Sequence, residues 1–389
     1  RVLEGAAAYP EVDFSEEGVE LQGALPPSAM QMRSDNDWLV YNLEAAESGI
    51  ATVIEQANLG RFSRMVVRDA TVEMNDAVYG VLRLFKGINL DIAPSPDGKV
   101  VRGSFTADFD GSVMNGTLER TLSEDGATST LTMAVTNLNL GAFVPMNEDA
   151  QLVSLVGTSA VSADIRFNVA TGKIKHADFH IDLTGMDVKI DKDYIPLATN
   201  IIEIAWQPEI GQFDMAETRI SVGDSTGYVS GVFKLGLDDL YGPVVGMSVH
   251  GRDINIRPDK TTSDSPFTNL TFQGWSAPLY GATGIDLFRV EKADGAWLAA
   301  QGRLDVLVRG VGVDMTVETD QISADDVKRL WPYFVAPEGR DWFKKNVVGG
   351  QLAHLTMKYS FPAGTMPLPG ENKPLPKNSI AIDMAAEGV

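Results

Sequence analysis

The chain has 389 residues, of which 44% are hydrophobic, and 53 acidic against 32 basic side chains give it a formal net charge of -21. This hydrophobic content is ample for a folded core and excludes a disordered chain. The acidic field, with no basic stripe to offset it, argues against nucleic acid as a partner. The absence of cysteine excludes thiolate metal sites, thiol nucleophiles and disulfides.

Neither end of the sequence resembles a natural terminus. The chain starts at Arg1 without a methionine, and it ends in Ser379-Ile380-Ala381-Ile382-Asp383-Met384, which is typical of a strand that has just begun. No stretch approaches the roughly 18 apolar residues of a membrane span, and there is no signal peptide. We therefore expect an internal fragment whose membrane anchor lies outside it.

Residues 1–60 form the least regular part of the sequence. Short extended pieces are expected between Val12 and Leu25, where Pro26-Pro27 ends them. The apolar spacing from Asp37 to Leu59 favours a helix over 37–59, broken at Gly49.

From residue 61 to about 322 the sequence predicts one amphipathic strand after another. Val101 to Phe109 alternates apolar or small residues with polar ones, and several further segments repeat the pattern. Turns are predicted at Asp97-Gly98, Asp110-Gly111, Asp125-Gly126, Thr171-Gly172 and Asp294-Gly295. At Arg309-Gly310 the alternation changes phase, which predicts a bulge or corner. The fold class is therefore mainly β: an elongated antiparallel meander forming a curved, groove-like or half-barrel structure.

A short helical interruption is predicted near 323–348. Ser323-Ala324-Asp325-Asp326 resembles a capping box, and Pro337-Glu338 opens a second helix that Gly349-Gly350 stops. We expect residues 323–350 to form a helix pair. Residues 351–389 would then hold a strand, a loop rich in proline and glycine over 362–376, and the start of a further β repeat.

The helical interruption also carries a resemblance to a known family. Leu330-Trp331-Pro332, followed by Arg340, Trp342, Asn346 and Gly349-Gly350, resembles a segment of AsmA-like bacterial proteins, in particular the large YhdP-like branch. The strands over 60–360 are similar in style, and the family is related to TamB-like repeating β-groove lipid transfer proteins. The resemblance marks the helical motif as a family feature without a known role.

The resemblance implies a periplasmic protein of the Gram-negative envelope, tethered to the inner membrane outside this fragment. Its β-groove would bind or conduct phospholipid acyl chains towards the outer membrane and so contribute to outer-membrane biogenesis. The expected partner is phospholipid, with inner- and outer-membrane proteins as further candidates. The lipid species and the direction of transport are left open.

The residues predicted to line such a groove are apolar side chains that share one face of the strands. They are Val101, Phe105, Phe109, Phe167, Phe179, Ile181, Leu304 and Val306. Hydrocarbon requires only apolar area, so an open greasy sheet face can hold it. The alternative is a closed sandwich core without a ligand, in a structural or partner-binding scaffold of the envelope.

The helix pair with Trp331 and Trp342 has several interpretations. It can act as a gate, a membrane contact or a docking surface, because amphipathic aromatics favour interfaces. The interpretation that we prefer is a plug or cap that covers apolar surface at the end of the β structure.

No constellation of residues indicates catalysis or metal binding. His176 and His180 are four apart, but Phe179 and Ile181 place them on a strand, where such a spacing does not form a metal site. The carboxylates between Asp187 and Asp193 lack the glycine and distal glutamate of a calcium loop, and a solvated loop is expected. We predict no enzyme activity, no metal and no cofactor; a polysaccharide-acting enzyme is the third hypothesis.

Overall fold

The computed structural model describes most of the chain from residue 44 onward. The described residues are 44, 47–52, 54–56, 59, 63–76, 81–143, 153–190, 193–198, 200–208, 211–238, 242–257, 265–277, 281–307, 310–331, 337–365, 374 and 376–388. The extended pieces expected between Val12 and Leu25 lie outside this part of the chain.

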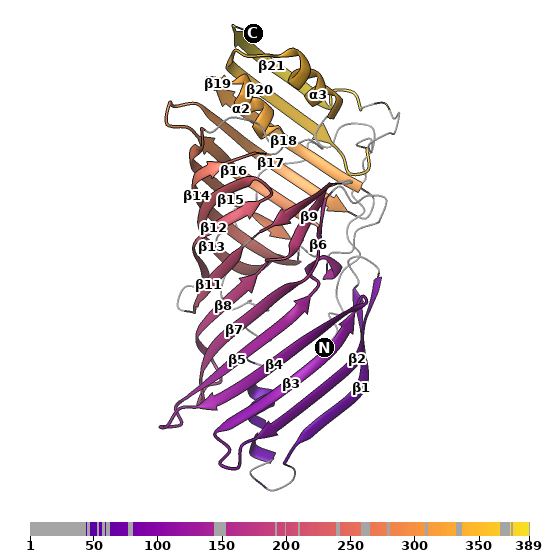
Figure 1. Ribbon diagram of the computed structural model, residues 1–389, viewed down its shortest axis with the longest axis vertical. Coiled ribbons are helices and arrows are strands. Elements are labelled where there is room, and N and C mark those ends of the chain that lie inside the picture. The colour runs from indigo at the N-terminus through magenta and orange to yellow at the C-terminus, as the bar shows by residue number, and fades with distance from the viewer. Residues whose placement is uncertain are drawn as a thin grey trace.

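One antiparallel sheet of 18 strands forms the body of the described molecule (Figure 1). It runs from β1 (Met65–Asp76) at one end of the long axis to β21 (Ile380–Glu387) at the other. Each of these two edge strands pairs with a single neighbour among the described residues, so the sheet is open. The predicted elongated antiparallel meander is confirmed.

The other strands of this sheet follow one another nearly in chain order. They are β2 (Val81–Pro94), β3 (Val100–Phe109), β4 (Ser112–Leu122), β5 (Thr128–Leu138), β7 (Ser159–Asn168), β8 (Ile174–Asp182), β11 (Ile201–Gln207), β12 (Gln212–Val222), β13 (Ser225–Asp238), β14 (Gly242–Asn255), β15 (Phe267–Ala277), β16 (Ala282–Glu291), β17 (Trp297–Leu307), β18 (Gly310–Asp320), β19 (Ile322–Ser323) and β20 (Gln351–Phe361).

A second sheet of three short strands interrupts the order. It contains β6 (Val153–Val156), β9 (Met186–Ile190) and β10 (Asp193–Leu197). The expectation of a solvated loop over 187–193 is therefore wrong. Val188 pairs with both Leu155 and Ile195. The apolar residues that alternate along this segment therefore determine that it forms a strand, although carboxylates lie between them.

The predicted turns all join neighbouring strands. At Asp110 and Gly111 the φ angles are 53° and 76°, and Phe109 pairs directly with Ser112. This is the two-residue turn with both φ angles positive, whose twist matches that of the flanking strands. The other four predicted turns connect β2 to β3, β4 to β5, β7 to β8 and β16 to β17.

The change of phase at Arg309-Gly310 marks the end of one strand and the start of the next, where a bulge or corner was predicted. Leu307 pairs with Gly310, so the chain reverses here and two separate strands, β17 and β18, follow each other. Each strand carries its own apolar alternation, and a change of phase between them needs no irregularity within a strand.

Helical structure occurs at both ends of the sheet. Residues 44, 47–52 and 54–56 are helical, which confirms part of the helix expected over 37–59, but Gly49 does not break it. At the other end lie α2 (Ala324–Leu330) and α3 (Pro337–Asn346), as predicted, and a 3-10 turn, η2, spans Leu140–Phe143. Ser323 caps α2 by accepting a hydrogen bond from the Asp326 amide at 3.1 Å.

Candidate functional site

One face of the large sheet, the apolar face, is continuous from β2 to β21. It is defined by a row of residues that pair directly from strand to strand. The row is Pro94, Val101, Arg120, Leu131, Ile165, Ala177, Trp206, Phe213, Phe233, Met247, Gly274, Ile285, Gly302, Met315, Tyr359 and Ile380. Apart from Arg120 and the half-buried Tyr359, these residues are apolar or glycine.

The predicted lining residues lie on this face, but they are covered to different extents. Val101, Phe109 and Phe167 are buried, with at most 4% of their surface exposed. The side chains of four others are half-buried: Phe105, Phe179, Ile181 and Leu304. Val306 belongs to β17, but its side chain lies outside the description.

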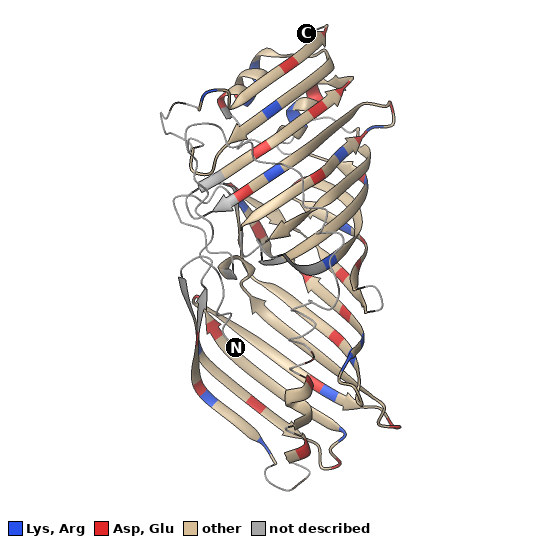
Figure 2. Ribbon diagram, turned by 180° about the vertical axis from the view of Figure 1, so that it is seen from behind, with Lys and Arg blue, Asp and Glu red and all other residues tan. Residues whose placement is uncertain are grey.

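The helical residues 47–52 and 54–56, called the helix over 47–56 below, cover the apolar face at one end. Ile54 packs against Ile92 and Val101, and Ile50 packs on Leu131 and its neighbours. Figure 2 shows the helix lying across this part of the sheet. The deep burial of Val101 and Phe167 follows from this cover and from neighbouring strands.

Two ion pairs fix this helix to the sheet. Glu47 accepts hydrogen bonds from Arg120 Nε at 2.9 Å and from the Ser129 hydroxyl at 2.6 Å, and all three residues are buried. Glu44 accepts from Lys173 Nζ at 2.7 Å nearer the surface. The Glu47 pair is the tighter constraint, because movement of the helix would leave the buried charge of Arg120 without compensation.

At the other end, α2 covers the apolar face. Val327 and Leu330 pack against the cluster of Ile322, Leu352 and Leu355, as Leu298 of β17 does. Leu330 also contacts the neighbouring cluster of Ile254, Phe267 and Val290. The helix therefore closes over β15 to β20, as the predicted plug or cap would.

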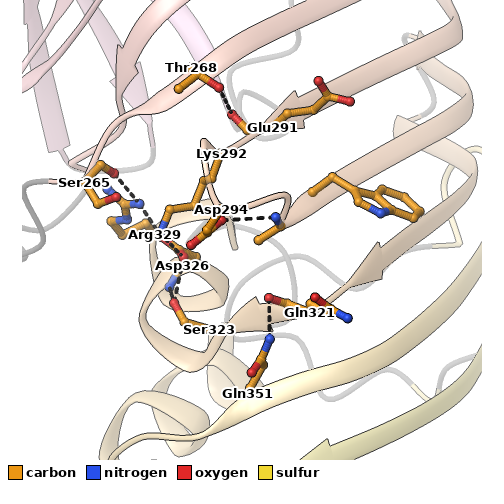
Figure 3. Close-up of polar contacts among 12 residues, drawn as sticks. Ser265, Thr268, Glu291, Lys292, Asp294, Gln321, Ser323, Asp326, Arg329 and Gln351 are labelled. Atoms are coloured by element: carbon orange, nitrogen blue, oxygen red, sulfur yellow. Dashed lines mark hydrogen bonds and ion pairs between the residues drawn. The ribbon is translucent and has the colours of Figure 1, made fainter.

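A buried ionic cluster holds α2 in place (Figure 3). Asp326 accepts from Lys292 Nζ at 2.8 Å and from the Ser323 hydroxyl at 2.7 Å, and it also pairs with Arg329. Arg329 donates to the Ser265 carbonyl at 3.0 Å and lies over the Phe267 ring. Burial alone would raise the pKa of Asp326, but the hydrogen bonds from Lys292, Ser323 and Arg329 outweigh it and hold the pKa below its ordinary value.

The motif that resembles the AsmA-like family builds the contact between α2 and α3. The Trp331 ring lies 5.9 Å from the Phe343 ring and close to Gly339, and Arg340 Nε donates to the Trp331 carbonyl at 2.9 Å. Asn346 donates to the Trp342 carbonyl, and Gly350 accepts from the Ala324 amide. Gly349 and Trp342 are exposed, Trp342 by 62%, and Pro332 lies outside the described residues.

Between the two helices the apolar face is only partly covered. Phe233, Met247, Phe272, Phe288 and Met315 keep part of their surface exposed. The face ends on β21, where Ile382 and Met384 are 57% and 64% exposed. The described structure therefore presents a half-exposed apolar surface between the two helices, and a further exposed stretch of the same face on β21.

Polar groups of the described residues also lie outside the apolar face. A cavity of about 590 Å³ lies beside the α2 cluster, but Lys292, Asp294, Gln321, Gln351 and Glu387 among others give it a polar lining. His176 and His180 lie on β8, where His176 contacts Asp178 at 2.8 Å. Among the described residues no group of three or more histidines and carboxylates is arranged to hold a metal ion.

Sequence reasoning missed both buried ionic groups. Arg120 occupies an apolar position in the alternation of Met114, Leu118 and Leu122, and this mismatch was a readable signal. Its partner Glu47 is 73 residues away, and only the packing of the helix brings the two together.

Comparison with known proteins adds no relative. No family model matches this chain, and no curated protein or solved structure is significantly similar to it. In the part of the chain that is described, no helix is both long and apolar enough to cross a bilayer.

Proposed function

We propose that this chain binds phospholipid acyl chains on the apolar face and conducts them between the membranes of a Gram-negative envelope. The observation that carries the proposal is the half-exposed part of the apolar face between the helices at its two ends. Phe233, Phe272 and Phe288 are only half-buried there, and the exposed part of each ring offers hydrocarbon surface to a ligand. The family resemblance of the Trp331 to Gly350 motif supports the same function and a periplasmic location.

The energetics suit such a ligand. Burial of apolar surface gains roughly 25 cal/mol per Å², so an acyl chain that buries about 300 Å² gains roughly 7 kcal/mol. Because the surface continues from strand to strand, a chain that slides along it keeps this contact area and meets small barriers. The mechanism is passive and needs no covalent step. The net charge of -21 keeps a protein with such a surface in solution.

Mass spectrometry of the protein, purified without detergent, tests the proposal. We expect co-purified phospholipid, and we expect Phe272→Asn to reduce the loading several-fold while the far-ultraviolet circular dichroism spectrum is kept. Tyr228→Asn is the matched control, because Tyr228 is an aromatic residue of β13 that contacts Arg252 and lies on the opposite face. An empty protein that also takes up no fluorescent lipid would contradict the proposal.

A scaffold without a ligand is the second candidate, and one observation favours it. Val101 and Phe167 have no exposed surface, so in this region the apolar face is already a closed core. If the protein is a scaffold, Phe272→Asn should lower its stability without any change in bound lipid. The same measurements of lipid loading distinguish this outcome from lipid binding.

A further inference from the structure

Arg120 is out of place in its surroundings. In the row that defines the apolar face it pairs with Val101 on one side and Leu131 on the other, and neither has any exposed surface. Its own side chain is 6% exposed. Arg102, by contrast, is 69% exposed and pairs with Glu119 on the opposite face of β3 and β4.

The donors around Arg120 converge on one oxygen. Glu47 Oε1 accepts hydrogen bonds from Arg120 Nε at 2.9 Å and from the Ser129 hydroxyl at 2.6 Å. Arg120 Nη2 also lies 2.8 Å from the same oxygen. The other carboxylate oxygen, Oε2, is buried and has no hydrogen-bond partner among the described residues. The sheet thus presents a cradle of donors for an anion, and the carboxylate of the helix meets it through only one of its two oxygens.

Stability alone gives a weak reason for this arrangement. A buried ion pair is often no more stabilising than apolar residues of similar volume, because desolvation offsets the attraction. Leucine at positions 47 and 120 would join the apolar packing of Ile50, Ile54 and Leu131 around them. A guanidinium fork with a neighbouring hydroxyl is, however, well matched to phosphate oxygens.

We infer that Arg120 and Ser129 form a site for the phosphate of a phospholipid headgroup, which Glu47 occupies in this structure. The inference rests on the proposed function and deepens it. When the helix over 47–56 moves away, Arg120 and the acyl-binding surface under Ile50 and Ile54 become accessible together. The helix then acts as a plug that a phospholipid replaces. The phosphate takes the place of the Glu47 carboxylate, and the acyl chain takes the place of Ile50 and Ile54.

Binding of two fluorescent lipids with the same tails tests the inference: NBD-labelled phosphatidylglycerol and NBD-labelled diacylglycerol, which lacks the phosphate. In Glu47→Gln, which weakens the hold on Arg120, we expect phosphatidylglycerol to bind about tenfold more tightly than diacylglycerol. Adding Arg120→Met should remove this preference, and adding Arg102→Met, the matched control, should keep it. Ser129→Ala, expected to reduce the preference, replaces Arg120→Met if that variant does not fold.

Each other outcome has a definite meaning. Equal binding of both lipids by Glu47→Gln would leave the proposed function intact and overturn the headgroup site, so that Glu47 and Arg120 only fasten the helix. Binding of inorganic phosphate alone as tightly as phosphatidylglycerol would assign the site to free phosphate and overturn the headgroup assignment. If no variant bound either lipid, the proposed function would fail, and this inference with it.

Discussion

At the scale of single residues, two buried ionic groups join helices to the sheet. Glu47 and Arg120 join the first helix to the sheet, and Asp326, Lys292 and Arg329 join α2 to it. Each group lies within apolar surroundings, so the loss of one partner leaves another charge without compensation. Such losses are costly, whereas exposed pairs matter little.

Replacement of Asp326 by asparagine should therefore destabilise the protein strongly. Lys292 and Arg329 would keep their charges in a buried site, and we expect a loss of about 3 kcal/mol in the free energy of unfolding. Urea denaturation of the variant and the wild type measures this difference in the free energy of unfolding. Asp325→Asn is the control, because Asp325 is 67% exposed and, within the described part of the chain, pairs only with Lys328 in the same helix. A loss of less than about 0.5 kcal/mol in both variants would contradict a structural role of the cluster.

The same carboxylate should make the stability depend on pH in the acid range. The pKa of Asp326 is lower in the folded protein than its ordinary value of 3.8, so its contribution is complete above that value. As the pH falls through the lower pKa of the folded state, the contribution is lost. The difference in stability between the wild type and Asp326→Asn should therefore shrink on acidification, as urea titrations at several pH values would show. A difference that grew towards acid pH would refute the assignment.

At the scale of elements, close contacts between strands fix the register of the sheet. Gly116 of β4 lies opposite Phe105 of β3, and a Cβ atom built on it would fall 2.0 Å from the Phe105 ring. The Phe105 ring thus lies directly over the backbone of Gly116, and a residue with a side chain at position 116 would collide with it. This pairing keeps the apolar residues of both strands on one face.

Gly116→Ala should cost about 1–3 kcal/mol in the free energy of unfolding, because Phe105 must leave its position. Thermal or urea unfolding checks the value, with Asn115→Ala on the exposed face as the control. In a Phe105→Leu background the added cost should be smaller, since the shorter side chain vacates the space. Equal costs in both backgrounds would show that Phe105 does not cover Gly116.

At the scale of the whole molecule, the sheet is a one-dimensional array. Each strand pairs with its neighbours in the sheet, and the apolar clusters near β3 and near β19 share no residue. Stability in such an array is close to a sum of local terms. The helices at the two ends then control separate parts of the apolar face.

Hydrogen exchange should reveal this separation. We expect Asp326→Asn to speed amide exchange in α2 and in β18 to β20, and to leave β3 to β5 as protected as in the wild type. Mass spectrometry of peptides from both regions provides the readout, with the β3 to β5 peptides as internal control. Uniform acceleration along the chain would show instead a single cooperative unit.

The alternation of apolar residues and the turn dipeptides were enough to predict the antiparallel meander, the turns and the helical interruption. These features depend on residues close together in the sequence, such as Asp110 and Gly111 or Ser323 and Asp326. The errors arose where longer contacts decide: the strands β9 and β10 form because Val188 meets Leu155, and Gly49 stays helical within a helix that packs on the sheet.

Strand periodicity therefore determined, by itself, that this protein has one continuous apolar face, because side chains alternate with a period of two whatever the strand packs against. Which parts of that face are core and which are open surface was decided by the tertiary structure alone. Val101 and Phe272 have the same apolar character in the sequence. The helix over 47–56 buries Val101, whereas Phe272 lies beyond this helix and stays half-exposed. The pairing of Arg120 with Glu47 has the same origin: the alternation of β4 marks Arg120 as buried, but no local pattern identifies a partner 73 residues away.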